Sequence, residues 1–105
     1  MLRAGKRQLV TTGLVATECH SLLLHRLGAT AALEFLDSLL ARPHQRIVWP
    51  DADLVLDARD HWLRRLPDHA ITLTDAVSFE VMRQERIREA FTFDEDFRQA
   101  GFLVL

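Results

Sequence analysis

Cysteine is almost absent from this 105-residue chain, in which Cys19 is the only one. A single cysteine excludes an internal disulfide and a cysteine-rich zinc cage, and it suits a reducing compartment, so we expect a cytoplasmic protein. Long apolar runs are also missing, and the opening MLRAGKRQLV lacks the apolar stretch of a secretory signal. The sequence therefore predicts no association with a membrane.

An excess of positive charge is the third absence. The chain has 13 basic and 15 acidic residues, for a formal net charge of -2. Non-specific nucleic-acid binders carry a clear electropositive excess, so any nucleic-acid role here would need a local patch. What the chain does have is 49% hydrophobic residues, which is enough for a core. We expect residues 1–105 to form a single domain.

Strand-like and helix-like segments alternate along the sequence. Gln8–Thr12 is β-prone, and the next segment, Gly13–Leu27, has helical apolar spacing that Gly28 ends. The pattern continues with predicted helices at residues 30–42, 51–66 and 75–84, the last capped by Thr74, and with predicted strands at 46–49, 89–93 and 102–105. Parallel strands need crossover connections of this length, so the predicted class is α/β with a mainly parallel sheet.

Three acids fall where the loops of such a sheet lead into helices. Glu18 lies in the helix after the first predicted strand, Asp75 opens a later helix, and Asp94 follows the strand that ends at Phe93. Ligands bind at the carboxyl ends of parallel strands, and like charges gathered there require a positive partner. Oxygen-only ligands suit Mg²⁺ or Mn²⁺, which enzymes use to hydrolyse phosphodiesters. A metal-assisted hydrolytic site is the functional interpretation.

The same acids also have a structural interpretation. Asp75 in a first helical turn, and Asp94 with Asp96 in a turn after a strand, are common uses of carboxylates. Spacing alone leaves both interpretations open. Cys19 has no nucleophile signature around it, and the arginines near the acids are equally typical of solvated helix faces.

Three motifs together resemble one known family. They are LVTTGLVATE (Leu9–Glu18), LTDAVSFEVM (Leu73–Met82) and AFTFDEDFRQAGF (Ala90–Phe102), and they cover nearly all of the chain in the family's order. This combination is similar to the PIN-domain family, in particular to the VapC-type toxins of toxin-antitoxin pairs. The resemblance implies a three-layer fold, with a parallel sheet between helices, and a ribonuclease that depends on Mg²⁺ or Mn²⁺.

The resemblance also implies roles for individual residues. Glu18, Asp75 and Asp94 match the catalytic acids that hold the metal, and Asp96 is a neighbouring contributor. Thr92 matches the family's hydroxyl residue beside the last acid. The implied partners are an RNA substrate, a cognate antitoxin protein and a second copy in a homodimer, and the candidate RNA contacts are Thr92, Arg83 and Arg98.

One part of the family pattern has no counterpart in this sequence. The family begins with an apolar strand that ends in an Asp, followed by a helix, and Met1–Arg7 are expected to correspond only to the end of that helix. In the family this first strand lies between the strands that correspond to those at Leu9 and Ala90. Without it, two strand edges would be left unpaired. The alternative function is therefore a catalytically inactive PIN-like fragment that acts as a protein-binding or dimerising module.

Overall fold

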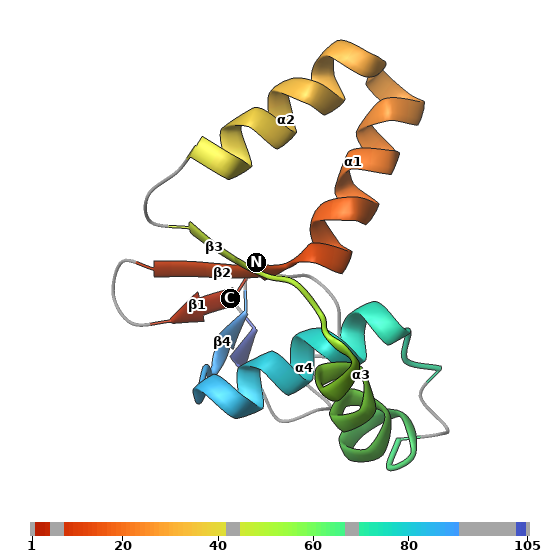
Figure 1. The fold of residues 1–105 in the computed structure, drawn as a ribbon, viewed down its shortest axis with the longest axis vertical. Helices are drawn as coiled ribbons and strands as arrows, with labels where there is room; N and C mark the ends of the chain where they lie inside the picture. Colours follow the sequence, from red (N-terminus) through yellow and green to blue (C-terminus); the bar gives the residue numbers. More distant parts are fainter. Residues whose placement is uncertain (1, 5–7, 42–44, 67–69, 91–102, 105) are drawn as a thin grey trace.

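A computed structural model describes residues 2–4, 8–41, 45–66, 70–90 and 103–104 of the chain. These residues form a sheet with helices on both sides (Figure 1). The elements, in chain order, are β1 (Leu2–Ala4), β2 (Gln8–Thr12), α1 (Gly13–Leu27), α2 (Ala29–Ala41), β3 (Gln45–Val48), α3 (Ala52–Ala58), the π-helical turn η1 (Arg59–Leu63), α4 (Leu73–Glu85), β4 (Glu89–Ala90) and β5 (Leu103–Val104). The hairpin of α1 and α2 stands on one side, and α3 and α4 lie on the other. The predicted three-layer α/β class is confirmed.

The strand order in the described sheet is β3-β2-β1-β4-β5. Two pairs are parallel, as predicted: β2 with β3, in a register that sets Thr12 opposite Val48, and β4 with β5. The central strand β1 is antiparallel to both of its neighbours, β2 and β4. The sheet is therefore mixed, with parallel pairs on either side of one antiparallel strand.

β1 corrects the expectation for the start of the chain. Leu2–Ala4 form a strand and not the end of a helix, and they occupy the position between Leu9 and Ala90 that was expected to be vacant. The physical reason is that two neighbouring strand edges present rows of unpaired N–H and C=O groups. A short extended segment satisfies both rows at once, whereas a helix end would satisfy neither.

The start of α4 also differs from the prediction. The helix begins at Leu73 because its N-cap is Thr72, whose hydroxyl oxygen accepts a hydrogen bond from the Asp75 backbone N–H at 3.1 Å. Thr74, the predicted cap, lies inside the first turn. Similarly, α2 begins at Ala29, one residue before the prediction. Of the predicted strand 89–93, the last three residues lie outside the described part of the chain.

The core lies between the sheet and the layer of α3 and α4. Residues 76–82 of α4 are all buried, so this helix is enclosed on every side over two turns. Val10 of β2 and Ala58 of α3 pack against it. Trp62 of η1 covers the outer side, with its ring 5.2 Å from that of Phe79 and tilted by 58°. Trp62 is thus partly buried and packs against the core.

A carboxylate lies inside this core. Glu80 is 0% exposed. Its two carboxylate oxygens accept hydrogen bonds from Arg83 Nε at 2.9 Å and Arg83 Nη2 at 2.7 Å. They also accept from Gln84 Nε2 at 2.9 Å and Trp62 Nε1 at 3.1 Å, and His61 Nδ1 lies 3.0 Å from Oε1. The cluster joins the middle of α4 to η1. A buried charge is tolerated only with such pairing.

The hydrogen bonds decide the ionisation of Glu80. Burial alone would raise the pKa of its carboxyl group, but the donors from Arg83, Gln84, His61 and Trp62 together outweigh burial and lower the pKa to about 2. Since this pKa is below the ordinary value of 4.5, the carboxylate stabilises the fold above about pH 4.5. That stabilisation is lost as the pH falls towards 2.

We predict that Glu80→Gln destabilises the protein at neutral pH and makes its free energy of unfolding depend less on pH in acid. Lowering the pKa of the Glu80 carboxyl group from 4.5 to about 2 corresponds to about 3 kcal/mol of stability, of which about 2 kcal/mol is lost by pH 3. Urea unfolding followed by circular dichroism at pH 7 and pH 3 should therefore show a smaller gap between variant and wild type in acid. Glu34→Gln, which neutralises an exposed acid on α2, is the matched control. An unchanged gap for Glu80→Gln at both pH values would contradict this account.

Candidate metal site

Two of the predicted site acids lie within the described residues, on different layers of the fold. Glu18 is on α1, which starts directly from the carboxyl end of β2, where the Thr12 hydroxyl accepts a hydrogen bond from Val15 N at 3.2 Å. Asp75 is in the first turn of α4. Glu18 is exposed and Asp75 is half-buried. Neither acid is fully buried.

One hydrogen bond brings the two segments together. The Thr74 hydroxyl donates to Glu18 Oε1 at 2.7 Å, across 56 positions of sequence. Because Asp75 is the next residue, the first turn of α4 and the Glu18 carboxylate meet at one place. The resemblance implied that these two acids belong to one site, and the structure brings their segments into contact.

The donors at this place suit a hard cation. Within the described ranges, no lysine, arginine or histidine side chain forms an ion pair with Glu18, and its one side-chain hydrogen-bond donor is the neutral hydroxyl of Thr74. Carboxylate oxygens are the ligands that Mg²⁺ and Mn²⁺ prefer. No group of three potential ligands is assembled by the described residues alone. Glu18 and Asp75 thus fit part of a divalent-cation site.

The other predicted site residues have different outcomes. Asp94, Asp96, Thr92 and Arg98 lie outside the described residues, so their roles stay predictions. Arg83 is described, and two of its guanidinium nitrogens are bonded to Glu80. It stands eight positions beyond Asp75, roughly 12 Å along the helix axis. Its role as an RNA contact stays a prediction, beside a clear role in the Glu80 cluster.

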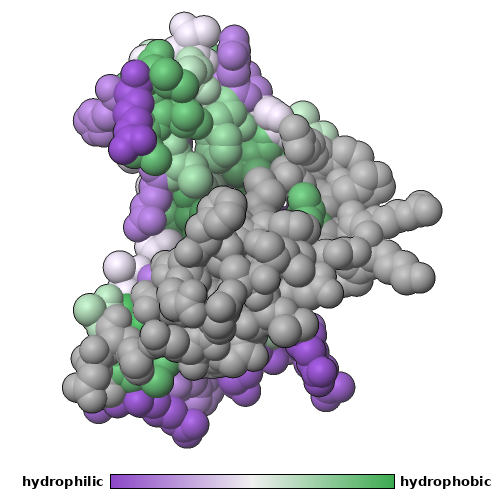
Figure 2. All heavy atoms as spheres, turned by 180° about the vertical axis from the view of Figure 1, so that it is seen from behind, coloured by the Kyte–Doolittle hydropathy of each residue, from purple (hydrophilic) through white to green (hydrophobic). Residues whose placement is uncertain are grey.

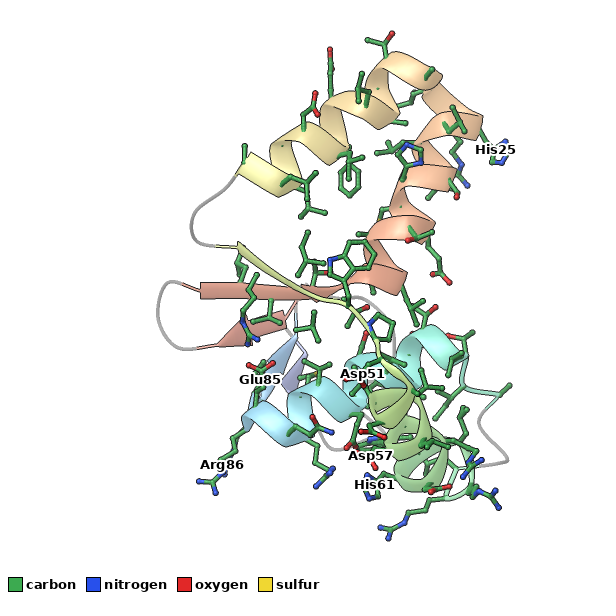
Figure 3. The ribbon with its side chains drawn as sticks, viewed as in Figure 1. His25, Asp51, Asp57, His61, Glu85 and Arg86 are labelled. Carbon is green, nitrogen blue, oxygen red and sulfur yellow. The ribbon has the colours of Figure 1, made fainter. Side chains whose placement is uncertain are left out.

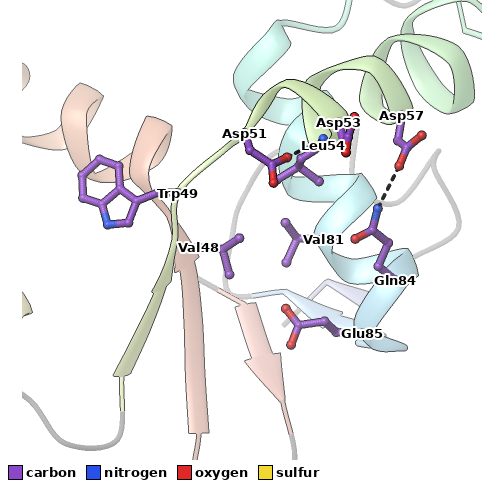
Figure 4. Close-up of a pocket in the computed structure, with 9 residues that line it drawn as sticks. All are labelled: Val48, Trp49, Asp51, Asp53, Leu54, Asp57, Val81, Gln84 and Glu85. Carbon is purple, nitrogen blue, oxygen red and sulfur yellow. Dashed lines mark hydrogen bonds between the residues drawn. The ribbon is translucent and has the colours of Figure 1, made fainter.

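A pocket of about 250 Å³ opens between β3, α3 and the second half of α4 (Figure 4). Its lining includes four acids, Asp51, Asp53, Asp57 and Glu85. Three of them have partners: Asp51 caps α3 through Leu54 N, Asp57 accepts from Gln84 Nε2 at 3.3 Å, and Glu85 pairs with Arg46. Neither Glu18 nor Asp75 lines this pocket, which is distinct from the candidate metal site.

The described histidines do not gather into a site. Figure 3 shows His25 near the tip of the hairpin of α1 and α2, while His61 lies on the opposite side of the sheet, beside α3. Cys19 is half-buried on α1.

Sequence reasoning missed the cluster around Glu80. A signal was present, since Glu80 stands between Phe79 and Val81 in a segment whose neighbours are apolar, with Arg83 and Gln84 at the i+3 and i+4 positions. An acid in that setting either faces solvent or is paired. The sequence gives no means of placing His61 and Trp62 beside it, because they come from a separate element.

The structure is an α/β fold in which Glu18, after β2, contacts the first turn of α4, which contains Asp75. Residues 2–103 match the PIN domain family. The chain is 36% identical over 94 residues to the 23S rRNA-specific endonuclease VapC20 of Mycobacterium tuberculosis, in the CDC 1551 / Oshkosh and ATCC 25618 / H37Rv strains, with 90% of this chain and 70% of each relative covered.

A solved structure agrees with the sequence matches. The crystal structure of M. tuberculosis VapC20, described as a sarcin-ricin loop cleaving toxin, superposes with a TM-score of 0.83 at 35% identity. The match covers 93% of this chain and 74% of that one. The chain therefore belongs to the PIN-domain family, and its relatives are of the VapC type, as its motifs predicted.

The first residue of α1 offers a test of how this helix is held. A Cβ atom on Gly13 would overlap the indole ring of Trp49, which lies directly on the glycine although the side chain is 62% exposed. We predict that Gly13→Ala lowers the stability by about 1–3 kcal/mol, because the ring must move. In a Trp49→Ala background the same change should cost almost nothing. Equal losses in both backgrounds, measured by denaturant unfolding, would rule out the overlap as the cause.

Proposed function

We propose that this protein is a metal-dependent ribonuclease of the VapC type, the toxin of a toxin-antitoxin pair, which hydrolyses RNA phosphodiester bonds. The match to the PIN domain family and the identity to a 23S rRNA-specific endonuclease support the reaction class. The observation that carries the proposal is the contact between Glu18 and the first turn of α4. This hydrogen bond brings Glu18 to the residue next to Asp75, so it places the segments of two motif acids together although they lie far apart in sequence.

Glu18 and Asp75 are the described residues that would hold the cation, and Asp94 and Asp96 are proposed to complete the ligand set. Mg²⁺ or Mn²⁺ fits these oxygen donors. When bound, such an ion activates water for attack and stabilises the charge that develops at the phosphate. The positive end of the α4 dipole adds to the attraction for the scissile phosphate. Thr92, Arg83 and Arg98 are proposed to contact the RNA.

The substrate is proposed to be ribosomal RNA, by extension from the relative whose name specifies 23S rRNA. The protein has no overall positive charge, at a formal net charge of -2, so binding must depend on local groups and on RNA shape. A cytoplasmic location follows from such a substrate. None of the helices in the described residues has the length and apolar character needed to cross a membrane.

The proposed protein partner is a cognate antitoxin. In the described part of the chain, the exposed large apolar side chains are concentrated on the hairpin of α1 and α2, where Figure 2 shows a hydrophobic surface. Those on the hairpin are Leu22, Leu24, Leu27, Leu33 and Leu40, while Trp49, Leu56 and Leu73 are exposed elsewhere. Such a surface is typical of protein-protein contacts. A homodimer is also proposed, and light scattering of the purified chain would measure it.

We predict that Asp75→Asn reduces RNA cleavage by on the order of 100-fold or more, because the site loses a charged ligand. The assay uses the full chain, rRNA and Mn²⁺ or Mg²⁺, with chelator added in a parallel reaction. Asp37→Asn, which removes the same charge from an exposed position on α2, should cleave like the wild type. Circular dichroism of both variants checks that the fold is retained.

Two outcomes would redirect the proposal. Cleavage that survives both chelation and Asp75→Asn would sink the metal-site assignment. A folded wild-type chain that cleaves no RNA with either ion would favour the alternative function, an inactive PIN-like module that binds a protein partner.

A further inference from the structure

Two threonines in the first turn of α4 make opposite kinds of hydrogen bond. The Thr72 hydroxyl accepts from the Asp75 backbone N–H at 3.1 Å and so caps the helix. The Thr74 hydroxyl donates, and its acceptor is Glu18 Oε1 at 2.7 Å. Since the cap is already supplied by Thr72, the hydroxyl of Thr74 is not needed to satisfy the helix terminus.

The bond from Thr74 joins a rigid donor to a mobile acceptor. Thr74 is half-buried in a capped helical turn, and threonine has few side-chain conformations. Glu18 is exposed on α1 and has three side-chain torsions, so by itself its carboxylate would sample several positions. The hydrogen bond selects the positions in which the carboxylate lies against the first turn of α4, next to Asp75.

The same bond leaves coordination capacity on the carboxylate. Among the described residues, the hydrogen bond of Thr74 is made to Oε1, and no donor side chain occupies Oε2. Because the hydroxyl is neutral, this hydrogen bond does not compensate the charge of Glu18. An arginine or lysine in the position of Thr74 would orient Glu18 equally well, but it would compete with a cation for the carboxylate.

We propose that Thr74 is a positioning residue for the metal site: it holds the Glu18 carboxylate towards Asp75 before the divalent cation binds. This inference rests on the proposed function, and it adds a residue that touches neither the cation nor the RNA. A partner that orients a metal ligand typically contributes 10–100-fold to metal affinity. The contribution of Thr74 is expected in that range and should operate entirely through Glu18.

The test measures Mn²⁺ binding to the 105-residue chain by isothermal titration calorimetry, without RNA. Thr74→Val keeps the shape of the side chain and removes the donor, and it should weaken Mn²⁺ binding by about 10–100-fold. Thr74→Ser keeps the hydroxyl and should restore affinity to near the wild-type value. Unfolding of the metal-free variants in urea separates a metal effect from a loss of stability.

The matched control is Thr17→Val. Thr17 is the residue before Glu18, and its hydroxyl donates to Gly13 O, within its own helix, at 2.7 Å. The control removes a threonine hydroxyl at the same site without touching the bond to Glu18, so Mn²⁺ affinity should stay at the wild-type value. A double-variant cycle adds Thr74→Val to Glu18→Gln, and no further loss of affinity is expected there.

The outcomes separate a failure of the positioning role of Thr74 from a failure of the proposed function. Wild-type Mn²⁺ affinity in Thr74→Val, a Thr74→Ser variant as weak as Thr74→Val, or equal losses with and without Glu18 would each overturn the positioning role and leave the proposed function standing. No Mn²⁺ binding by the folded wild-type chain would overturn both.

Discussion

The buried carboxylate of Glu80 is the constraint on which the second helical layer depends. Its pairing with Arg83 and Gln84 comes from its own helix, but Trp62 Nε1 and His61 Nδ1 approach from η1. A buried ion pair contributes little net stability compared with apolar packing, whereas an unpaired buried charge is strongly destabilising. The cluster therefore restricts the position of η1, because Glu80 can be buried only where the donors of η1 reach its carboxylate.

This condition extends to the candidate site through the rigidity of α4. The helix is enclosed over residues 76–82, so its rotation and its position along its axis are fixed by the core. Its first turn directly precedes the enclosed part, so the position of this turn is fixed as well. Thr74 meets Glu18 there. The parallel pair of β2 and β3 fixes the other side, because β2 leads straight into α1. The site is thus held from two layers that share few direct contacts.

Much of this arrangement could be predicted from the sequence, since it follows from local patterns. The alternation of apolar segments gave the α/β class, and the motifs around Glu18 and Asp75 indicated that two distant acids share a site. The prediction of Thr74 as the helix cap was wrong, since the cap is Thr72, which precedes Asp75 by three positions, the spacing of a capping box. Both residues are good caps, so propensity alone could not separate them.

Other features depend on tertiary context and could not be read from local patterns. Leu2–Ala4 are too few to show an alternating pattern, and they form a strand because two sheet edges flank them. The partners of Glu80 come from an element with its own helical pattern, and nothing in residues 59–63 indicates a π-helical turn. In both cases the stabilising groups are supplied by distant parts of the chain.

The charges along α4 are arranged with the helix dipole. Asp75 is at the positive, N-terminal end, and Arg83 is in the last turn, at the negative end. Each placement is favourable for the helix alone, so neither charge by itself indicates a function. What distinguishes them is their partners: Arg83 is bound to a buried carboxylate that the core requires, while the Asp75 segment contacts a second acid on another layer. Like charges that lie near one another at a surface oppose folding unless positive charge is close to them, and a divalent cation is the partner that the proposed function assigns to the acidic end of α4.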